Sequence, residues 1–236
     1  MFEKIKIHKK KGVYMNDLAG LVTQNQQELT PLIRLFIVLT FMMFLPTVVF
    51  MATSFVRIII TFSFLKSALG AQQSIPNQVL TGIALILTLF IMSPVINDIN
   101  KTAIQPYKNN QITFEQGIEK AQIPIKNFLL KQTRDDDIKL FLDSANMDKS
   151  KITRENVPLQ VLLPAFAISE LKTSFQIGFL IYLPFLLIDL VVSSTLMSMG
   201  MFMLQPAMIS LPFKLLLFIM VDGWNLLIKS LILSFS

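Results

Sequence analysis

The sequence lacks cysteine and nearly lacks histidine, and these two absences exclude several kinds of chemistry. Without Cys, the chain has no disulfide, no thiolate metal ligand and no Cys nucleophile. The one His lies at position 8 in a lysine-rich tail, so a His-based zinc site or a catalytic triad has almost no material. The motifs of zinc proteases, serine hydrolases, P-loop proteins and dinucleotide-binding proteins are also missing. We therefore expect neither an enzyme nor a bound cofactor.

Charged residues are scarce as well. They make up 15% of the 236 residues, whereas 53% are hydrophobic, and the mean hydropathy is +0.60. Soluble domains rarely have this composition, so it indicates an integral membrane protein or a subunit buried in an assembly. The net charge of +6 is spread along the chain. The sequence contains no basic helix with interleaved aromatics, which is the pattern that would indicate nucleic-acid binding.

Long apolar segments are the main feature that is present. Four segments stand out: Leu32–Ala52, Val79–Ile96, Gly178–Leu204 and Phe213–Leu233, the last broken at Asp222-Gly223. The opening residues lack the apolar run of a signal peptide, so the first segment is expected to be a membrane helix. The stretch with Arg57 and Lys66 is expected to be a loop between the first two segments. A shorter apolar run, Pro158–Ile168, contains Pro164 and predicts a separate interfacial or re-entrant piece.

This pattern predicts an all-α fold, with integral-membrane-type helical hairpins and a small helical soluble domain. In the soluble stretch, Thr113 with Gln116 predicts a capping box, followed by an amphipathic stripe that is interrupted at Pro124. Thr133 with Asp136 predicts a second cap. The predicted parts are a polar basic tail at 1–30, a first hydrophobic helical pair at 31–96, the soluble domain at 97–156 and a second hydrophobic helical pair at 157–236.

Acidic residues give two weak indications of chemistry. The three acids at 135–137 are consistent with a cation site, but acids that complement the positive end of a helix dipole are the favoured interpretation. Glu170 and Asp189 are candidates for a catalytic carboxylate pair. They are nineteen residues apart, and no pattern pairs them.

The final apolar part of the chain carries charges that a plain lipid anchor would not carry. Each one costs roughly 2.5–3.5 kcal/mol at a bilayer centre. We therefore expect them to face a partner, a water-filled path or another subunit. They are Glu170, Lys172, Asp189, Lys214, Asp222 and Lys229. In the same part, Met occurs at every second position from Met197 to Met203, around Gly200, and from the residues alone these side chains are expected to fill a core.

Several long motifs occur in one order along the chain. They are MATSFVRIIITFSFLKSALG at 51–70, PNQVL at 76–80, FIMSPVI at 90–96, LPAF at 163–166, SELKTSFQIGF at 169–179, LPFLLIDLVVSSTLMSMGM at 183–201 and LPFKLLLFIMVDGW at 211–224. Together they resemble the flagellar biosynthetic protein FliP family, which includes injectisome homologues. The resemblance covers residues 45–235, and the stretches 130–134 and 221–224 are more similar to the flagellar branch.

The resemblance implies a transport-channel subunit. FliP-like proteins form the core of the type III export gate with FliQ- and FliR-like partners and work with other flagellar export components. Several copies, a pentamer, wind with these partners into a helical ring, and unfolded flagellar proteins pass through its centre. The implied location is the bacterial inner membrane, in the flagellar basal body, with 97–156 in the periplasm. The five lysines in the first eleven residues indicate a cytoplasmic start instead, so the orientation stays open.

The resemblance also implies site residues. In the family, a methionine loop after a Met-Gly pair projects into the pore as a gasket. The resemblance therefore favours a pore loop, and not core packing, for these methionines. The implied gasket residues are Met199, Met201, Phe202 and Met203, with Phe202 in place of a usual Met and Gln205 in place of the first residue of a common double proline. The expected polar contacts between subunits are Arg57, Lys66, Glu170, Lys172, Asp189, Lys214 and Asp222.

Other interpretations stay open at this point. Glu170 and Lys172 are equally consistent with a membrane interface, and Asp189 with a proton carrier. The chain is also consistent with an injectisome gate subunit. A secondary transporter or ion channel would place Asp189 and Lys214 at its binding site, but it would predict internal repeats, and none is evident.

Overall fold

The computed structural model describes residues 31–145 and 153–235, apart from residues 32, 41, 45, 48, 72 and 73. All regular elements in these ranges are helical, which confirms the all-α class. The predicted basic tail at 1–30 lies outside them. The chain divides into two units, Met1–Val49 and Phe50–Ser236. The helices are Ile33–Met51, α2 (Phe55–Ala68), α3 (Asn77–Ile99), α4 (Gln105–Lys108), α5 (Phe114–Gln132), α6 (Asp135–Ser144), α7 (Leu159–Ser198), α8 (Pro206–Met220) and α9 (Gly223–Leu233).

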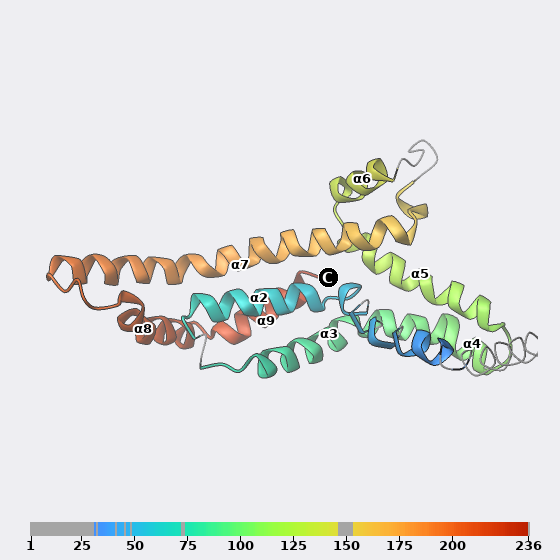
Figure 1. Ribbon diagram of the computed structural model, residues 1–236, viewed down its shortest axis with the longest axis horizontal. Helices are drawn as coiled ribbons and strands as arrows, with labels where there is room; N and C mark the ends of the chain where they lie inside the picture. Colours follow the sequence, from blue (N-terminus) through green and yellow to red (C-terminus); the bar gives the residue numbers. More distant parts are fainter. Residues whose placement is uncertain are drawn as a thin grey trace, which may run out of the picture. The chain divides into compact units, whose positions relative to one another are not determined.

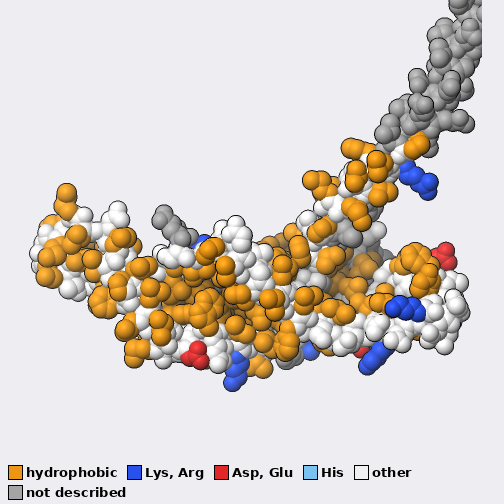
Figure 2. Space-filling view, turned by 90° about the horizontal axis from the view of Figure 1, so that it is seen from below, with side chains coloured by type: hydrophobic (Ala, Val, Ile, Leu, Met, Phe, Trp, Pro, Cys, Tyr) orange, Lys and Arg blue, Asp and Glu red, His pale blue; other side chains and the backbone are white. Residues whose placement is uncertain are grey.

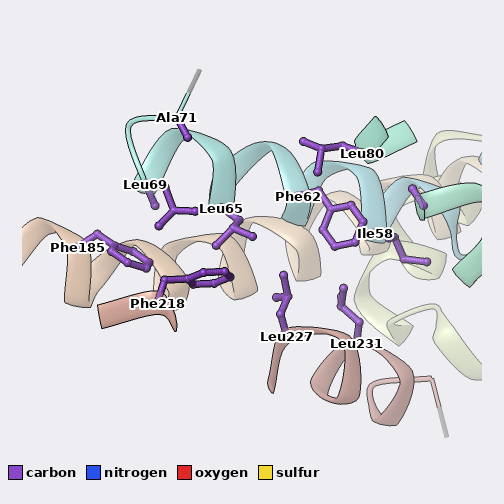
Figure 3. Packing of buried hydrophobic residues seen from close by; sticks show 12 residues of the cluster. Ile58, Phe62, Leu65, Leu69, Ala71, Leu80, Phe185, Phe218, Leu227 and Leu231 are labelled. Carbon is purple, nitrogen blue, oxygen red and sulfur yellow. The ribbon is translucent and has the colours of Figure 1, made fainter. Parts of the chain in front are cut away.

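Helix α2 occupies the centre of the larger unit, beside α7 (Figure 1). Its buried residues recur at spacings of three and four and include Ile58, Phe62 and Leu65. Phe185 of α7 and Leu231 of α9 belong to the same core (Figure 3). Burying each large apolar side chain contributes roughly 1.5–3 kcal/mol. The expected loop around Arg57 is therefore wrong: the stretch is too short to span a membrane, but it forms a helix on which α3, α7, α8 and α9 pack.

Helix α7 is 40 residues long, about 60 Å at the usual rise per residue. It runs continuously through Pro164 and Pro184, so the prediction of a separate short piece at Pro158–Ile168 is wrong. A proline inside a helix removes one N–H and one intrahelical hydrogen bond. Around Pro164, packing offsets the lost hydrogen bond, because Leu162 and Phe166 are fully buried there in a second core with α5 and α6.

The predicted soluble stretch begins inside a helix. Helix α3 continues through a π-helical turn, Asn100–Ile104, into α4. The capping box at the start of α5 is confirmed, since the Gln116 N–H donates to Thr113 Oγ1 and the Thr113 N–H donates to Gln116 Oε1. Helix α5 continues through Pro124, which interrupts the apolar stripe but not the helix.

The predicted second cap is wrong. The Thr133 hydroxyl donates to the backbone oxygen of Leu129 at 2.6 Å, in the preceding helix, and Arg134 is the N-cap residue of α6. The hydroxyl of Thr133 therefore closes the end of α5 and does not open α6. The acids at 135–137 do lie in the first turn of α6, which confirms the helix-dipole interpretation of their position.

Membrane-type helices account for much of the described chain. Three are long and apolar enough to cross a bilayer: Ile33–Met51, Asn77–Lys108 and Leu159–Ser198. The pair α8 and α9 passes the same test together, with a bend of 63°. Hydrophobic side chains cover much of the face in Figure 2. The larger unit thus exposes apolar side chains that a lipid or another protein chain must cover.

The bend between α8 and α9 depends on two neighbouring residues. Asp222 has a left-handed backbone conformation, with φ of +49°, so α8 cannot continue through it into α9. A Cβ at Gly223 would lie 2.2 Å from the Phe218 ring, so only glycine permits this approach. Trp224 then packs edge-to-face on Phe218, with ring centroids 5.4 Å apart. The helix break that the sequence predicts at Asp222-Gly223 is confirmed.

Close packing of α2 on α7 generates a stability prediction. A Cβ at Gly178 would lie 2.4 Å from the Phe64 ring and 3.0 Å from Phe64 Cβ, so rotating the ring alone cannot relieve the clash. Gly178→Ala should destabilise the protein by about 1–3 kcal/mol, a usual cost of overpacking. Gly82→Ala is the control, because its Cβ would meet no described atom within 4 Å. That variant should be neutral or more stable by up to about 1 kcal/mol. Thermal unfolding in detergent, followed by Trp224 fluorescence, measures both; equal effects would contradict the prediction.

Candidate functional site

Two deeply buried charges of the described chain form an ion pair between the central helices. Arg57 on α2 and Glu170 on α7 are 3% and 0% exposed. Arg57 Nε donates to Glu170 Oε2 at 2.8 Å, and Nη2 donates to Glu170 Oε1. This two-point arrangement is the geometry in which a guanidinium binds a carboxylate most strongly. It joins the two central helices at one point.

The remaining donors of Arg57 reach two further parts of the chain. Nη1 donates to both the backbone oxygen and the hydroxyl of Ser234 at 2.9 Å, and Nη2 donates to Gln132 Oε1 at 3.1 Å. The guanidinium carbon also lies 3.8 Å from the centre of the Phe235 ring. All five N–H groups are thereby used, which is the condition under which a buried charge is tolerated.

Asp137 forms a second polar cluster where α6 meets α7. Its carboxylate accepts a hydrogen bond from Ser169 Oγ at 2.7 Å and pairs with Lys172. Burial raises the pKa of Asp137, but the hydrogen bonds from Lys172 and Ser169 and the positive charges of Lys172 and Arg134 lower it more, so the pKa falls below its usual value. The cluster therefore fixes α6 on α7.

A third pair lies in the hairpin of α7 and α8. Lys214 Nζ donates to Asp189 Oδ2 at 2.7 Å, and Ser210 Oγ donates to Asp189 Oδ1 at 2.6 Å. Lys214 is almost fully buried, whereas Asp189 remains partly exposed. The pair thus neutralises two charges on otherwise apolar helices.

Six of the seven polar residues expected between subunits have a partner within this chain. Besides the three pairs above, Lys66 Nζ donates to Asn77 Oδ1 at 2.7 Å. Asp222 lies exposed at the bend between α8 and α9. Contacts of these residues with other subunits stay a prediction. Within one chain, their charges serve to hold helices together.

The sequence reasoning missed six members of these clusters: Asp137, Gln132, Ser169, Ser210, Ser234 and Phe235. Asp137 carries a usable signal, because it precedes Ile138 on the buried face of α6, where a carboxylate needs a partner. The others carry no signal in the sequence. Gln132 and Ser234 are ordinary helix-end residues that become ligands of Arg57 only through the tertiary fold.

The methionine row ends α7 and forms the loop to α8, residues 199–205 (Figure 1). Gly200 has φ of +73°, and the Met201 N–H donates to the Leu196 oxygen at 3.0 Å, which closes the helix end. The side chains of the implied gasket are exposed, and Met203 is 99% exposed. They do not fill the core of this chain. The loop therefore presents flexible apolar side chains to something outside the chain.

The described chain contains no group of three or more His, Asp or Glu residues that could hold a metal ion. Asp135 is paired with Arg154, Asp136 Oδ1 lies 3.8 Å from Lys139 Nζ and Asp137 is paired with Lys172, so the three acids in the first turn of α6 already face bases. Glu170 and Asp189 lie in separate clusters, each with its own cation. The arrangement is suited to holding helices in place.

Comparisons with known proteins give a consistent result. The profile of the FliP family matches residues 38–231. The chain is 49% identical to the "Flagellar biosynthetic protein FliP" of Bacillus subtilis (strain 168), over 94% of this chain and 100% of that protein. It is 50% identical to the protein of the same name from Pectobacterium carotovorum subsp. carotovorum, over 92% and 86% of the two chains. The corresponding protein of Aquifex aeolicus (strain VF5) is 44% identical, over 86% of each chain.

The Arg57 network generates a prediction about stability. Arg57→Ala should cost about 3–5 kcal/mol, because it leaves the buried carboxyl group of Glu170 without its partner. The double variant Arg57→Met with Glu170→Leu should be clearly less destabilised than Arg57→Ala, since it removes both charges and keeps apolar volume. Unfolding in detergent, followed by Trp224 fluorescence, compares them. A double variant as unstable as Arg57→Ala would show that packing, and not the unpaired charge, sets the cost.

The lowered pKa of Asp137 generates a pH prediction. The native state favours the ionised carboxylate, so its contribution is full above the unfolded-state pKa of about 3.9 and is lost as pH falls through the lower folded-state pKa. The stability difference between wild type and Asp137→Asn should therefore be largest above about pH 5 and shrink below pH 4. Thermal unfolding across pH 2–7 measures it. Asp136→Asn, at an exposed side chain, should differ little from wild type at any pH; a matching pH dependence there would contradict the assignment.

Proposed function

The chain belongs to the FliP family, and we propose that it is a core subunit of the channel through which unfolded flagellar proteins are exported. It is a membrane-embedded flagellar biosynthetic protein of the export apparatus, in a family of structural components and not of enzymes. The proposed location is the bacterial inner membrane, within the flagellar basal body. The proposed partners are FliQ- and FliR-like subunits, other export components and further copies of this chain, arranged as a pentamer in a helical ring.

The distribution of apolar side chains supports an assembled state. Large hydrophobic residues are exposed along α3, α7 and α8, for example Phe90, Phe179 and Phe213. Polar clusters, in contrast, lie between helices of the same chain. A single chain with this surface needs lipid or protein against it. A ring of subunits supplies such a cover for helices that also carry charges.

The exposed methionine loop is the observation that carries the proposal. Met201, Phe202 and Met203 are apolar but point away from the core of their own chain. In a ring, the same loop from each copy would meet around a central axis. Unbranched, polarisable methionine side chains can close around chains of varied sequence and still move apart. The phenyl ring of Phe202 would add a stiffer element to that constriction.

Contacts between subunits are proposed for the polar residues that keep exposed surface. Lys172 is half-exposed, Asp189 is partly exposed and Asp222 is exposed. Lys66 is also partly exposed. We assign Arg57, Glu170 and Lys214 a different part in assembly: because they are buried, they would act by fixing the helices that carry the contact surfaces.

Replacing the loop side chains tests the proposal. The triple variant Met201→Ala, Phe202→Ala and Met203→Ala should still assemble with itself and with FliQ- and FliR-like partners, because these side chains make little contact within the chain. Ion leakage across the membrane should rise, because the bulk that closes the constriction is lost. Assembly is measured by size-exclusion chromatography in mild detergent, and leakage by conductance or by sensitivity of cells to small permeants.

A matched control uses three exposed apolar residues at the other end of α8: Ile219→Ala, Met220→Ala and Val221→Ala. This variant also removes exposed apolar side chains, but it should not raise leakage. Unchanged leakage in the loop variant, together with loss of the complex, would show that the methionines are packing residues. A wild-type chain that remains a monomer and ignores both partners would contradict the proposed assembly.

A further inference from the structure

We infer that the larger unit binds an anionic phospholipid, with the phosphate between Lys101 and Lys120 and an acyl chain along the groove between α3 and α5. Two adjoining cavities carry this inference. The smaller, about 430 Å³, holds the two lysines, and the larger, about 870 Å³, is mostly apolar. The inference does not depend on the proposed channel.

The smaller cavity has an excess of positive charge. Lys101 lies in the π-helical turn after α3, and Lys120 lies on α5. No acid lines this cavity, and neither lysine has an ion pair or side-chain hydrogen bond within the described ranges. Its other walls include Pro106 and Ile123, which are apolar. Two free ammonium groups above an apolar floor suit a phosphate that is attached to a hydrocarbon.

The larger cavity continues from the smaller one. Thr102, Ile123 and Pro124 line both, so the two form one connected surface. Along α3, the larger cavity is walled by Ile91 and Val95, among other apolar residues. It also holds one acid, Asp98, and one base, Lys131, so its charge is balanced. The net positive charge therefore lies at one end, and the apolar wall extends away from it.

The position along the apolar helix fits the same ligand. The stretch Asn77–Lys108 is 32 residues long, about 48 Å, which exceeds the hydrocarbon core of about 30 Å. If the apolar part around Phe90 lies in the hydrocarbon, Lys101 falls roughly 16 Å further along the helix, towards the headgroups. Lysines at such positions extend to the lipid phosphates.

Lipid binding by the intact chain tests the inference. The detergent-purified protein is titrated with phosphatidylglycerol or with phosphatidylcholine of the same acyl chains, and binding is measured by native mass spectrometry. The wild type should prefer phosphatidylglycerol. Lys101→Gln with Lys120→Gln should weaken phosphatidylglycerol binding about 25-fold, roughly fivefold for each lysine, and leave phosphatidylcholine binding unchanged.

The control variant, Lys139→Gln with Lys229→Gln, makes the same change in net charge at exposed lysines outside both cavities. It should bind phosphatidylglycerol as the wild type does. Equal loss in both variants, or equal binding of both lipids by the wild type, would overturn the inference. Competition by inorganic phosphate at concentrations that match the lipid would show a phosphate site without an acyl-chain groove, and would also overturn it. Thermal unfolding checks that each variant keeps the wild-type fold.

Discussion

A positive charge inside an apolar protein must be fully satisfied, and Arg57 shows how this constraint organises the larger unit. Its five N–H groups bind Glu170, Gln132 and Ser234, which come from α7, from α5 and from the end of α9. Each of these parts must reach the guanidinium at hydrogen-bonding distance. Hydrophobic packing alone would tolerate some sliding between helices, whereas a buried ion pair with directional bonds does not.

The two other clusters apply the same constraint on α7, one directly beside Glu170 and one further along the helix. Asp137 fixes α6 through Ser169 and Lys172, and Asp189 holds α8 through Lys214 and Ser210. Each cluster neutralises a charge that would be costly in an apolar setting. Helix α7 therefore serves as a long frame on which other helices are fixed by paired charges. The methionine loop lies at one end of this frame, where α7 ends.

The larger unit has an unusual distribution of polar and apolar side chains between its interior and its surface. Much of the polar chemistry lies between helices, while phenylalanine, leucine and methionine side chains lie exposed on α3, α7 and α8. This distribution fits a subunit whose surface is covered by lipid or by other chains. The pair of cavities at α3 and α5 departs from that pattern, because free lysines adjoin the apolar wall. Such a combination suits a phospholipid, in which a charged headgroup is attached to hydrocarbon chains, better than it suits plain hydrocarbon.

The sequence by itself determined the all-helical class, the membrane character, the family, the capping box at Thr113 and the break at Asp222-Gly223, because composition, apolar runs and capping patterns are local signals. Only the tertiary structure decided that residues 55–68 form the central helix, that the run 158–168 continues into α7, and that Arg57 binds Glu170 across 113 residues of chain. A pattern of hydrophobic residues shows that a segment is buried, but it does not show which segment covers it. The partners of a buried charge depend on distances between helices, and those distances exist only once the helices have packed.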